Sequence, residues 1–250
     1  GTMQLLAACQ KSPSVSKLVV KSSTSIYGAG PKDPAMFTEE MEPKHTPGSG
    51  WAKDSVEVES YVRGFARRRP DVSVTTLRFA NFLGPRVETP MSSYFELPVI
   101  PTLLGHDARL QFIHEDDGLE ALRQATIDEH PGMFNVAGDG IILLTQAARR
   151  AGRPTISLPA SSAGLVGAII RRLGLADFSP EQVRFLTYGR GVDTTRMRTV
   201  FGFTPQHTTP ETFDAFVRSR RLNRMLPPER VEAVEEQLVS LLTGRGVVNG

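Results

Sequence analysis

Two spacings of apolar residues alternate along the first 150 positions of the chain. Short runs rich in valine, leucine, isoleucine and phenylalanine predict strands at residues 18–23, 72–79, 110–114 and 133–136. Stretches with an apolar residue every three or four positions predict helices at 1–9, 54–68, 116–128 and 145–151. Strands that alternate with helices in this way are typical of a parallel sheet covered by helices on both faces. The pattern therefore predicts an α/β fold.

The pattern changes after residue 160, where helical spacing predominates. Helices are predicted at 161–173, 180–187, 194–200, 210–222 and 228–242. We expect a sheet-containing domain over residues 1–140, a smaller and mostly helical lobe over 141–225, and a C-terminal helix and tail over 226–250. Residues 86–106 are expected to contribute to the lobe. Residues 30–50, rich in proline, lysine, glutamate and glycine, are expected to form a solvated loop beside a cleft.

Composition and charge narrow the classes of function. The formal net charge of +2 gives no electrostatic reason to expect a nucleic-acid partner. The single cysteine, Cys9, cannot form an internal disulfide and fits a reducing cytoplasm. No cluster of cysteine and histidine suggests a metal site. The apolar segment 163–170 is too short to span a bilayer and is followed by Arg171 and Arg172, so we expect a packed helix and no stable membrane insertion.

Several short motifs point together to one family. A strand ends in Ser-Ser-Thr-Ser-Ile-Tyr-Gly at 22–28, and the next strand continues as Leu-Arg-Phe-Ala-Asn-Phe-Leu-Gly-Pro at 77–85. Later motifs lie at 109–117 and 193–205. In this order and spacing they resemble the extended short-chain dehydrogenases, the NAD-dependent epimerase/dehydratases, and most nearly the UDP-glucose 4-epimerase group. The resemblance implies a Rossmann-like, doubly wound parallel sheet, incomplete at its N-terminus, with a smaller helical C-terminal substrate lobe.

The resemblance also implies a specific chemistry. In the family, a tyrosine exchanges a proton with a sugar hydroxyl while NAD takes or returns hydride. A lysine one helical turn later holds the ribose and lowers the pKa of that tyrosine. A serine or threonine at the end of the preceding strand hydrogen-bonds the same hydroxyl. Ser23 matches this serine, and Thr24 is a second candidate. The competing interpretation is that these hydroxyls only satisfy backbone groups at the strand end.

The tyrosine–lysine pair has two possible registers, and neither contains both residues. Ser49 with Lys53 keeps the lysine. Trp51 with Ser55 keeps an aromatic residue and places Glu59 where the family often has a glutamate. The stripe that includes residues 51 and 55 is the more apolar one of the predicted helix, so we expect Trp51 and Ser55 to face inward. An indole does not ionise near neutral pH and a serine carries no charge, so we expect the standard proton transfer to be lost.

NAD or NADP is the cofactor that the resemblance implies, with Ser22, Phe79, Ala80 and Phe82 beside it. The family's glycine-rich phosphate loop, G-x-G-x-x-G between a strand and a helix, does not occur in these 250 residues. We therefore expect the chain to be the C-terminal two-thirds of a longer protein or a natural truncation, and to bind NAD weakly by itself.

A nucleotide-sugar or a related small molecule is the ligand that the resemblance implies. Asn81 matches the asparagine that contacts the nucleotide-sugar. Arg109 is offset by one residue from the family's phosphate-binding position, which Leu110 occupies. Arg190 and Arg196 are further candidates for a phosphate contact. A homodimer formed through two helices is expected by analogy with the family.

Two functions remain open on the sequence. In the first, the chain acts on or binds a nucleotide-sugar as an NAD(P)-dependent epimerase/dehydratase with altered chemistry. In the second, it is a catalytically silent relative that serves as a binding, regulatory or scaffold protein. Trp51 and Ser55 favour the second, whereas Ser23 and Asn81 fit both.

Overall fold

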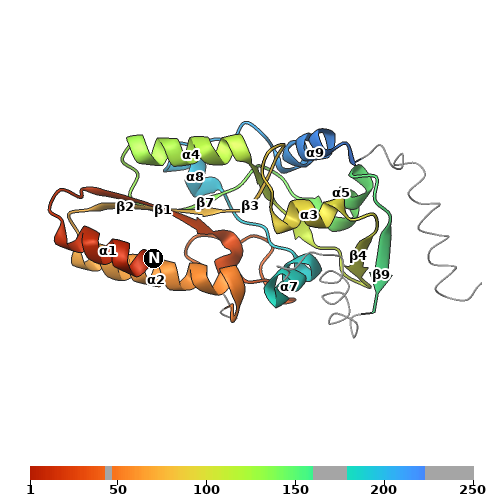
Figure 1. Cartoon of the computed structure of the whole chain (residues 1–250), viewed down its shortest axis with the longest axis horizontal. Helices are drawn as coiled ribbons and strands as arrows, with labels where there is room; N and C mark the ends of the chain where they lie inside the picture. Colours follow the sequence, from red (N-terminus) through yellow and green to blue (C-terminus); the bar gives the residue numbers. More distant parts are fainter. Residues whose placement is uncertain (43–46, 160–178, 223–250) are drawn as a thin grey trace, which may run out of the picture.

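The computed structural model of the protein describes residues 1–42, 47–159 and 179–222. A parallel sheet of three strands forms the first part of the molecule (Figure 1). The strands are β1 (Lys17–Ser23), β2 (Ser73–Phe79) and β7 (Gly132–Val136), in the order β1-β2-β7. Val19 pairs with Thr75 and Val20 with Thr76, and such β-branched side chains fit a pleated surface. The predicted parallel α/β arrangement is confirmed.

Helices cover both faces of this sheet (Figure 1). Helices α1 (Thr2–Lys11) and α2 (Gly50–Arg68) lie on one face, and α4 (Glu115–Ile127) and α8 (Thr195–Thr199) lie on the other. Leu6, Val62 and Phe65 pack together in the core beneath α1 and α2. Leu77 and Phe134 belong to a separate core on the side of α4 and α8. The sheet is therefore buried from both sides, as alternating strands and helices require.

The sequence of α2 explains which side of it faces the sheet. Its buried residues recur with helical spacing, namely Ala52, Ser55, Glu59, Val62 and Phe65. The helix ends at Arg68, shortly before Pro70, which cannot donate a helical hydrogen bond. It begins at Gly50, earlier than the predicted start at 54, because the glycine-rich sequence before it reads as a loop.

A second part of the molecule lies beside the end of the sheet (Figure 1). It contains α3 (Pro90–Glu96), β4 (Ile100–Leu103), α5 (Leu144–Arg150), β9 (Thr155–Leu158), α7 (Pro180–Tyr188) and α9 (Thr209–Arg220). Phe95, Phe112 and Phe213 meet in its core. Helices α3, α7 and α9 each begin with a serine or threonine cap followed within two residues by proline, a strong helix-start signal. The domain boundaries expected at 140 and 225 stay a prediction.

Short strands join the two parts, and here the structure differs from the prediction. The strand expected over 110–114 is divided at Gln111 into β5 (Arg109–Leu110) and β6 (Phe112–His114). β5 pairs with β8 (Ile142–Leu143), and β6 with β3 (Asn81–Leu83). The Gln111 side chain accepts from Val192 N and donates to Gly138 O. The two hydrogen bonds of the Gln111 side chain to distant backbone groups thus stabilise the interruption between β5 and β6.

Some predictions fall on residues that the structure does not describe, and one pair of strands was missed by the prediction. The helices predicted at 161–173 and 228–242, and the apolar segment 163–170, lie outside the described residues. The parallel pair β4–β9 was not predicted. Within 1–42, 47–159 and 179–222, no helix is long and apolar enough to cross a membrane.

Candidate functional site

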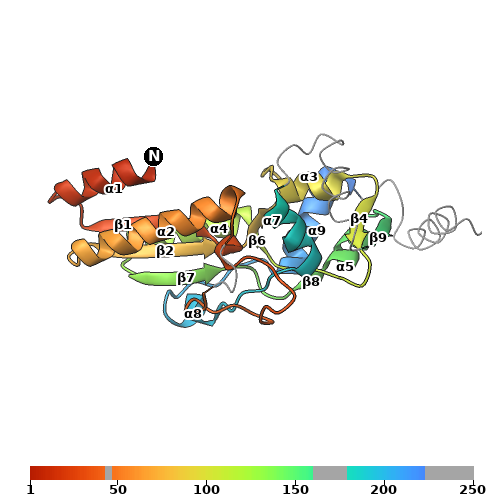
Figure 2. The same cartoon turned by 90° about the horizontal axis from the view of Figure 1, so that it is seen from below.

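A cavity of about 530 Å³ opens where the carboxyl ends of β1 and β2 meet the second part of the molecule. Its walls come from the end of β1, the first turn of α2, residues 79–82, the start of α3, and α7. Helix α7 lies beside the first turn of α2 (Figure 2). The carboxyl edge of a parallel sheet is where α/β proteins usually bind small molecules. This cavity is therefore the candidate site.

Four hydroxyl residues follow one another at the end of β1, and they differ in their environment. Ser22 Oγ donates to the Glu59 carboxylate at 2.5 Å, and Ser23 Oγ accepts from Ser25 N at 3.1 Å. Ser22, Ser23 and Ser25 line the cavity, whereas Thr24 is buried and is not among the lining residues. Ser25 Oγ is buried with no hydrogen-bond partner among the described residues. Ser25 was not a candidate from sequence; the residue lines the cavity, but its hydroxyl oxygen is buried.

Trp51 borders the cavity, but it is not buried as expected. Its side chain is 63% exposed, because the first turn of α2 faces the open cavity and none of the described elements covers it. Ser55, one turn later, is buried, does not line the cavity, and donates its hydroxyl to Trp51 O at 2.8 Å. Its hydroxyl is thus used within the helix. The residues of the alternative register, Ser49 and Lys53, also do not line the cavity.

Residues 79–82 form one continuous wall of the cavity. Phe79, Ala80, Asn81 and Phe82 all line it, at the point where β2 ends and β3 begins. Ala80 N donates to Val136 O at 2.9 Å, which fixes the backbone at this turn. Four of the residues that the resemblance implies, three for the cofactor and one for the substrate, are thus brought together.

Arg190 is the one of the three candidate arginines that reaches the cavity. It is buried, donates to Gly28 O at 2.7 Å, and lies 4.9 Å above the ring of Phe185. Within the described part of the chain, its Nε has no hydrogen-bond partner and its guanidinium makes no ion pair with a carboxylate. Burial lowers the pKa of Arg190 to about 10, so the guanidinium keeps its charge at neutral pH. Sequence could not choose this arginine, since its position depends on packing between distant segments.

Arg109 and Arg196 lie elsewhere. Arg109 is bonded through its backbone, accepting from Arg190 N at 2.8 Å. Arg196 pairs with Glu40 at 2.7 Å, and neither arginine is among the residues that line the cavity. Arg109 and Arg196 thus form no part of the cavity wall.

A buried ion pair supports the cavity from below, and it was not predicted as such. Arg78 binds Glu59 through two hydrogen bonds of 3.0 and 2.7 Å and also donates to Tyr27 Oη at 2.7 Å. Burial opposes the charge of Arg78, but the bonds to Glu59 and Tyr27 outweigh it and raise its pKa. Burial also raises the pKa of Tyr27, which donates to Asn135. Tyr27 is therefore a structural phenol and not a base for the cavity.

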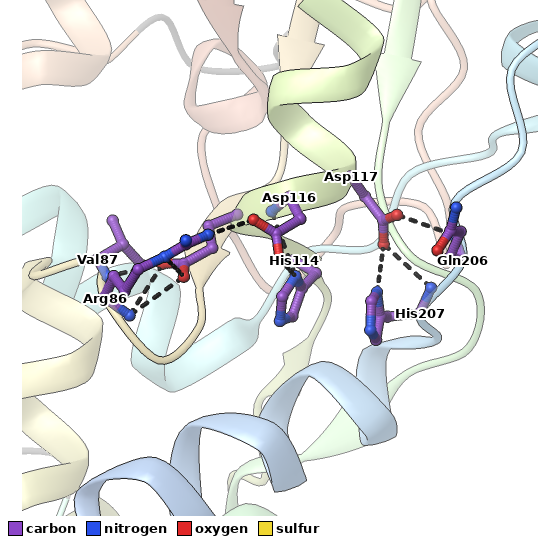
Figure 3. A network of polar contacts seen from close by, with 8 residues as sticks. Arg86, Val87, His114, Asp116, Asp117, Gln206 and His207 are labelled. Atoms are coloured by element: carbon purple, nitrogen blue, oxygen red, sulfur yellow. Dashed lines mark hydrogen bonds and ion pairs between the residues drawn. The ribbon is translucent and has the colours of Figure 1, made fainter.

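His114 belongs to a second polar network, at the start of α4 (Figure 3). Its ring stacks on that of His207 at 4.0 Å, and its Nδ1 accepts from Asp116 N. Asp117 binds His207 Nδ1 and the backbone N of residues 206 and 207. His114 caps a helix and does not line the cavity.

The cavity fits only part of a dinucleotide. Hydroxyl residues on one wall and the apolar wall of residues 79–82 suit the nicotinamide end. The described residues offer no glycine-rich turn between a strand and a helix for the pyrophosphate. Binding of the whole cofactor is therefore not explained by these residues.

Comparison with solved structures shows the fold. The UDP-glucose 4-epimerase of Thermotoga maritima, solved with UDP-glucose, superposes with a TM-score of 0.64 at 18% identity, over 88% of this chain and 68% of that one. The UDP-glucuronic acid 4-epimerase of Bacillus cereus, solved with UDP-glucuronic acid and NAD, gives 0.64 at 15% identity, over 88% and 66%. The fold is accordingly that of the Rossmann-like epimerases.

Sequence comparison shows the family. A Mycobacterium tuberculosis protein described as uncharacterized is 45% identical over 241 residues, which are 96% of this chain and 64% of the relative. The chain thus spans 64% of the length of that relative. The model of the NAD dependent epimerase/dehydratase family matches residues 1–137, and the chain belongs to this family.

Proposed function

We propose that the cavity binds a nucleotide-sugar and that Arg190 binds its diphosphate. The observation that carries the proposal is a buried guanidinium that borders the cavity without a carboxylate partner among the described residues. A buried charge without a partner is costly, and an anionic ligand would compensate for that cost. A guanidinium can also donate two bonds to one phosphate.

The other walls suit the rest of such a ligand. Ser23 and Asn81 are polar residues that line the cavity. The rings of Phe79, Phe82 and Phe185 provide apolar surface. A few polar groups on an otherwise apolar wall are typical of small-molecule sites.

We further propose that NAD or NADP, when bound, would lie against Ser22, Phe79, Ala80 and Phe82. The cofactor would supply hydride transfer. Ser22 would act indirectly, because its hydroxyl is held by Glu59 at 2.5 Å. The residues for the pyrophosphate would have to come from outside the described segments.

The standard proton transfer of the family is not part of this proposal. Trp51 has no group that ionises near neutral pH, and the Ser55 hydroxyl donates to Trp51 O. The second candidate function, a catalytically silent binding, regulatory or scaffold protein, is favoured by this arrangement. The first candidate requires the cavity to bind a nucleotide-sugar or a related ligand, and the second requires this only if the protein serves as a binding protein.

Binding can be followed through Trp51, because it is the single tryptophan of the chain and it borders the cavity. Titration with UDP-glucose should change its fluorescence and give a dissociation constant. Arg190→Met should weaken binding about tenfold or more, since a hydrogen bond to a charged group contributes about 1.5–3 kcal/mol. The control is Arg196→Met, which removes an arginine outside the cavity. Unchanged affinity in a folded Arg190→Met variant would contradict the proposal.

Where calorimetric titration shows that the protein binds NAD and UDP-glucose, turnover distinguishes the two candidate functions. With UDP-glucose and NAD, the wild-type chain should form no measurable 4-epimer. A double change, Trp51→Tyr with Ser55→Lys, restores the residue types of the family pair, and gained turnover would support an altered active site. Turnover by the wild-type chain would instead show that another group transfers the proton.

A further inference from the structure

Lys21 places a second cation in the cavity, on a different element from Arg190. It lies on β1 two residues before Ser23, so the two side chains leave the same face of the strand, and both line the cavity. Its Nζ is 5.8 Å from the ring centroid of Trp51 and 5.2 Å from that of Phe82. Because Lys21 lines the cavity, its strongly hydrated ammonium group lies near the candidate ligand site as well as near bulk solvent.

No carboxylate of the described residues pairs with Lys21. Of the residues that the structure describes, three charged ones line the cavity, namely Lys21, Glu181 and Arg190. The negative charge of Glu181 opposes the lowering of the Arg190 pKa by burial. The Glu181 carboxylate also accepts a hydrogen bond from Gly48 N at 3.5 Å. The described contacts of the Lys21 ammonium are with the two aromatic rings. The cavity therefore carries excess positive charge beside Trp51.

We propose that Lys21 binds a second anionic group of the ligand, a carboxylate on its sugar, and so selects nucleotide-sugars of acidic sugars. The inference rests on the proposed function, in which Arg190 binds the diphosphate. The two cations contact different walls, Lys21 at Trp51 and Phe82, and Arg190 at Gly28 and Phe185. A diphosphate held by Arg190 would leave Lys21 without an anion, and a carboxylate on the sugar would supply it.

The aromatic rings strengthen this selection. Cation–π contact with Trp51 and Phe82 holds the ammonium at the wall and replaces part of its water. A neutral sugar in the cavity would displace more of that water without supplying a charge, so it would bind less well. Ser23, next to Lys21 on the same face, would donate to the same end of the ligand.

The test compares UDP-glucuronic acid with UDP-glucose, which differ in having a carboxylate or a hydroxymethyl group on the sugar. Trp51 fluorescence and calorimetric titration are measured for the wild-type chain and for Lys21→Met. The wild-type chain should bind UDP-glucuronic acid about tenfold more tightly, as one charge-assisted contact implies. Lys21→Met should abolish this preference and leave the affinity for UDP-glucose within about twofold. Lys21 is an exposed side chain, so folding should be retained.

Lys53→Met is the matched control, because Lys53 is an exposed lysine that pairs with Glu57 and does not line the cavity. It should keep the preference of the wild-type chain. Equal affinities for both sugars in the wild-type chain would overturn the inference and leave the proposed function intact. A Lys21→Met variant that weakens both sugars equally would also overturn it, since Lys21 would then contact the part they share. Binding of neither sugar would refute the proposed function itself.

Discussion

Arg78 and Glu59 face each other inside the protein through two parallel hydrogen bonds, Nε to Oε1 at 3.0 Å and Nη2 to Oε2 at 2.7 Å. Their side chains are 4% and 3% exposed. Glu59 also accepts from Ser22, the residue before Ser23 on β1. The pair thus connects α2, β2 and β1 directly beneath the cavity, and the position of the serines depends on it.

Removing one partner of this buried pair should lower the free energy of unfolding of the chain. Glu59→Met leaves the Arg78 guanidinium buried without its carboxylate, and removing one partner of a buried pair costs about 3–5 kcal/mol. Urea denaturation followed by circular dichroism would measure the loss in the free energy of unfolding. The double change Glu59→Met with Arg78→Met should recover a large part of that loss, because no unpaired charge remains.

Arg63 provides the control for this prediction. It lies 3.8 Å from the same Glu59 carboxylate, but its side chain is 52% exposed. Arg63→Met should change the free energy of unfolding by at most about 1 kcal/mol. Equal effects of Glu59→Met and Arg63→Met would show that burial of the Arg78 pair does not matter.

The sheet could be predicted from sequence because its strands are apolar runs between helices. The pair β4–β9 could not be predicted in the same way. Each strand has four residues, β4 contains a proline, and the paired residues Ile100 and Thr155 are far apart in sequence. Short runs of this kind lack a period, so only tertiary packing decides their structure.

The sequence predicted several residues of the candidate site, but it did not predict how their side chains are arranged around the cavity. Motif order brought forward Ser23 and Asn81, which line the cavity. Periodicity placed Ser55 on the inner side of α2, but it could not show that Trp51 faces an open space. Lys21 stands in no motif, and only the direction of its side chain from β1 reveals it. Strand alternation places Lys21 on the same face as Ser23, but whether that face borders a cavity depends on tertiary packing and is not encoded locally.

We expect His114 to make the free energy of unfolding of the chain depend on pH. Its burial, and then the charge of His207, lower its pKa below the ordinary 6.5. Glu115, Asp116 and Asp117 act in the opposite direction, but the net shift is downward. The unfolded chain therefore takes up a proton more readily, and the free energy of unfolding should fall as the pH falls below about 6.5 toward the folded-state pKa.

His114→Asn tests this dependence, since asparagine can still cap the helix but does not titrate. Thermal melts between pH 5 and 7 should show a smaller loss of stability in the variant than in the wild-type chain, if about one proton is linked. His106→Asn is the matched control, because the His106 ring packs against Tyr188 and takes no part in the network of His114. A slope that decreases equally in both variants would contradict the assignment to His114.

Gly118 on α4 sets the position of Phe82, one of the cavity walls. A Cβ at residue 118 would overlap the edge of the Phe82 ring. Alanine is the better helix former by about 1 kcal/mol, but overpacking costs about 1–3 kcal/mol. Gly118→Ala should therefore destabilise the chain by about 1 kcal/mol and move Phe82. In a Phe82→Leu background the same change should be neutral or stabilising, and a loss of equal size there would refute the contact.

Trp51→Tyr should create a phenol whose pKa reports the charge of Lys21. The Lys21 ammonium lies 5.8 Å from the Trp51 ring, and a cation at such a distance stabilises a phenolate. Because the site is open to solvent, the pKa of the new phenol should fall below its ordinary value by about one unit or less.

Absorbance titration of Trp51→Tyr, with the curve of Trp51→Phe subtracted, isolates this phenol. Burial keeps the pKa values of Tyr27 and Tyr94 above the range of interest. Adding Lys21→Met should return the curve toward that of a free tyrosine. Curves that coincide with and without Lys21 would show that its charge does not reach residue 51, whereas separated curves would mean that β1 supplies the cation that Ser55 does not.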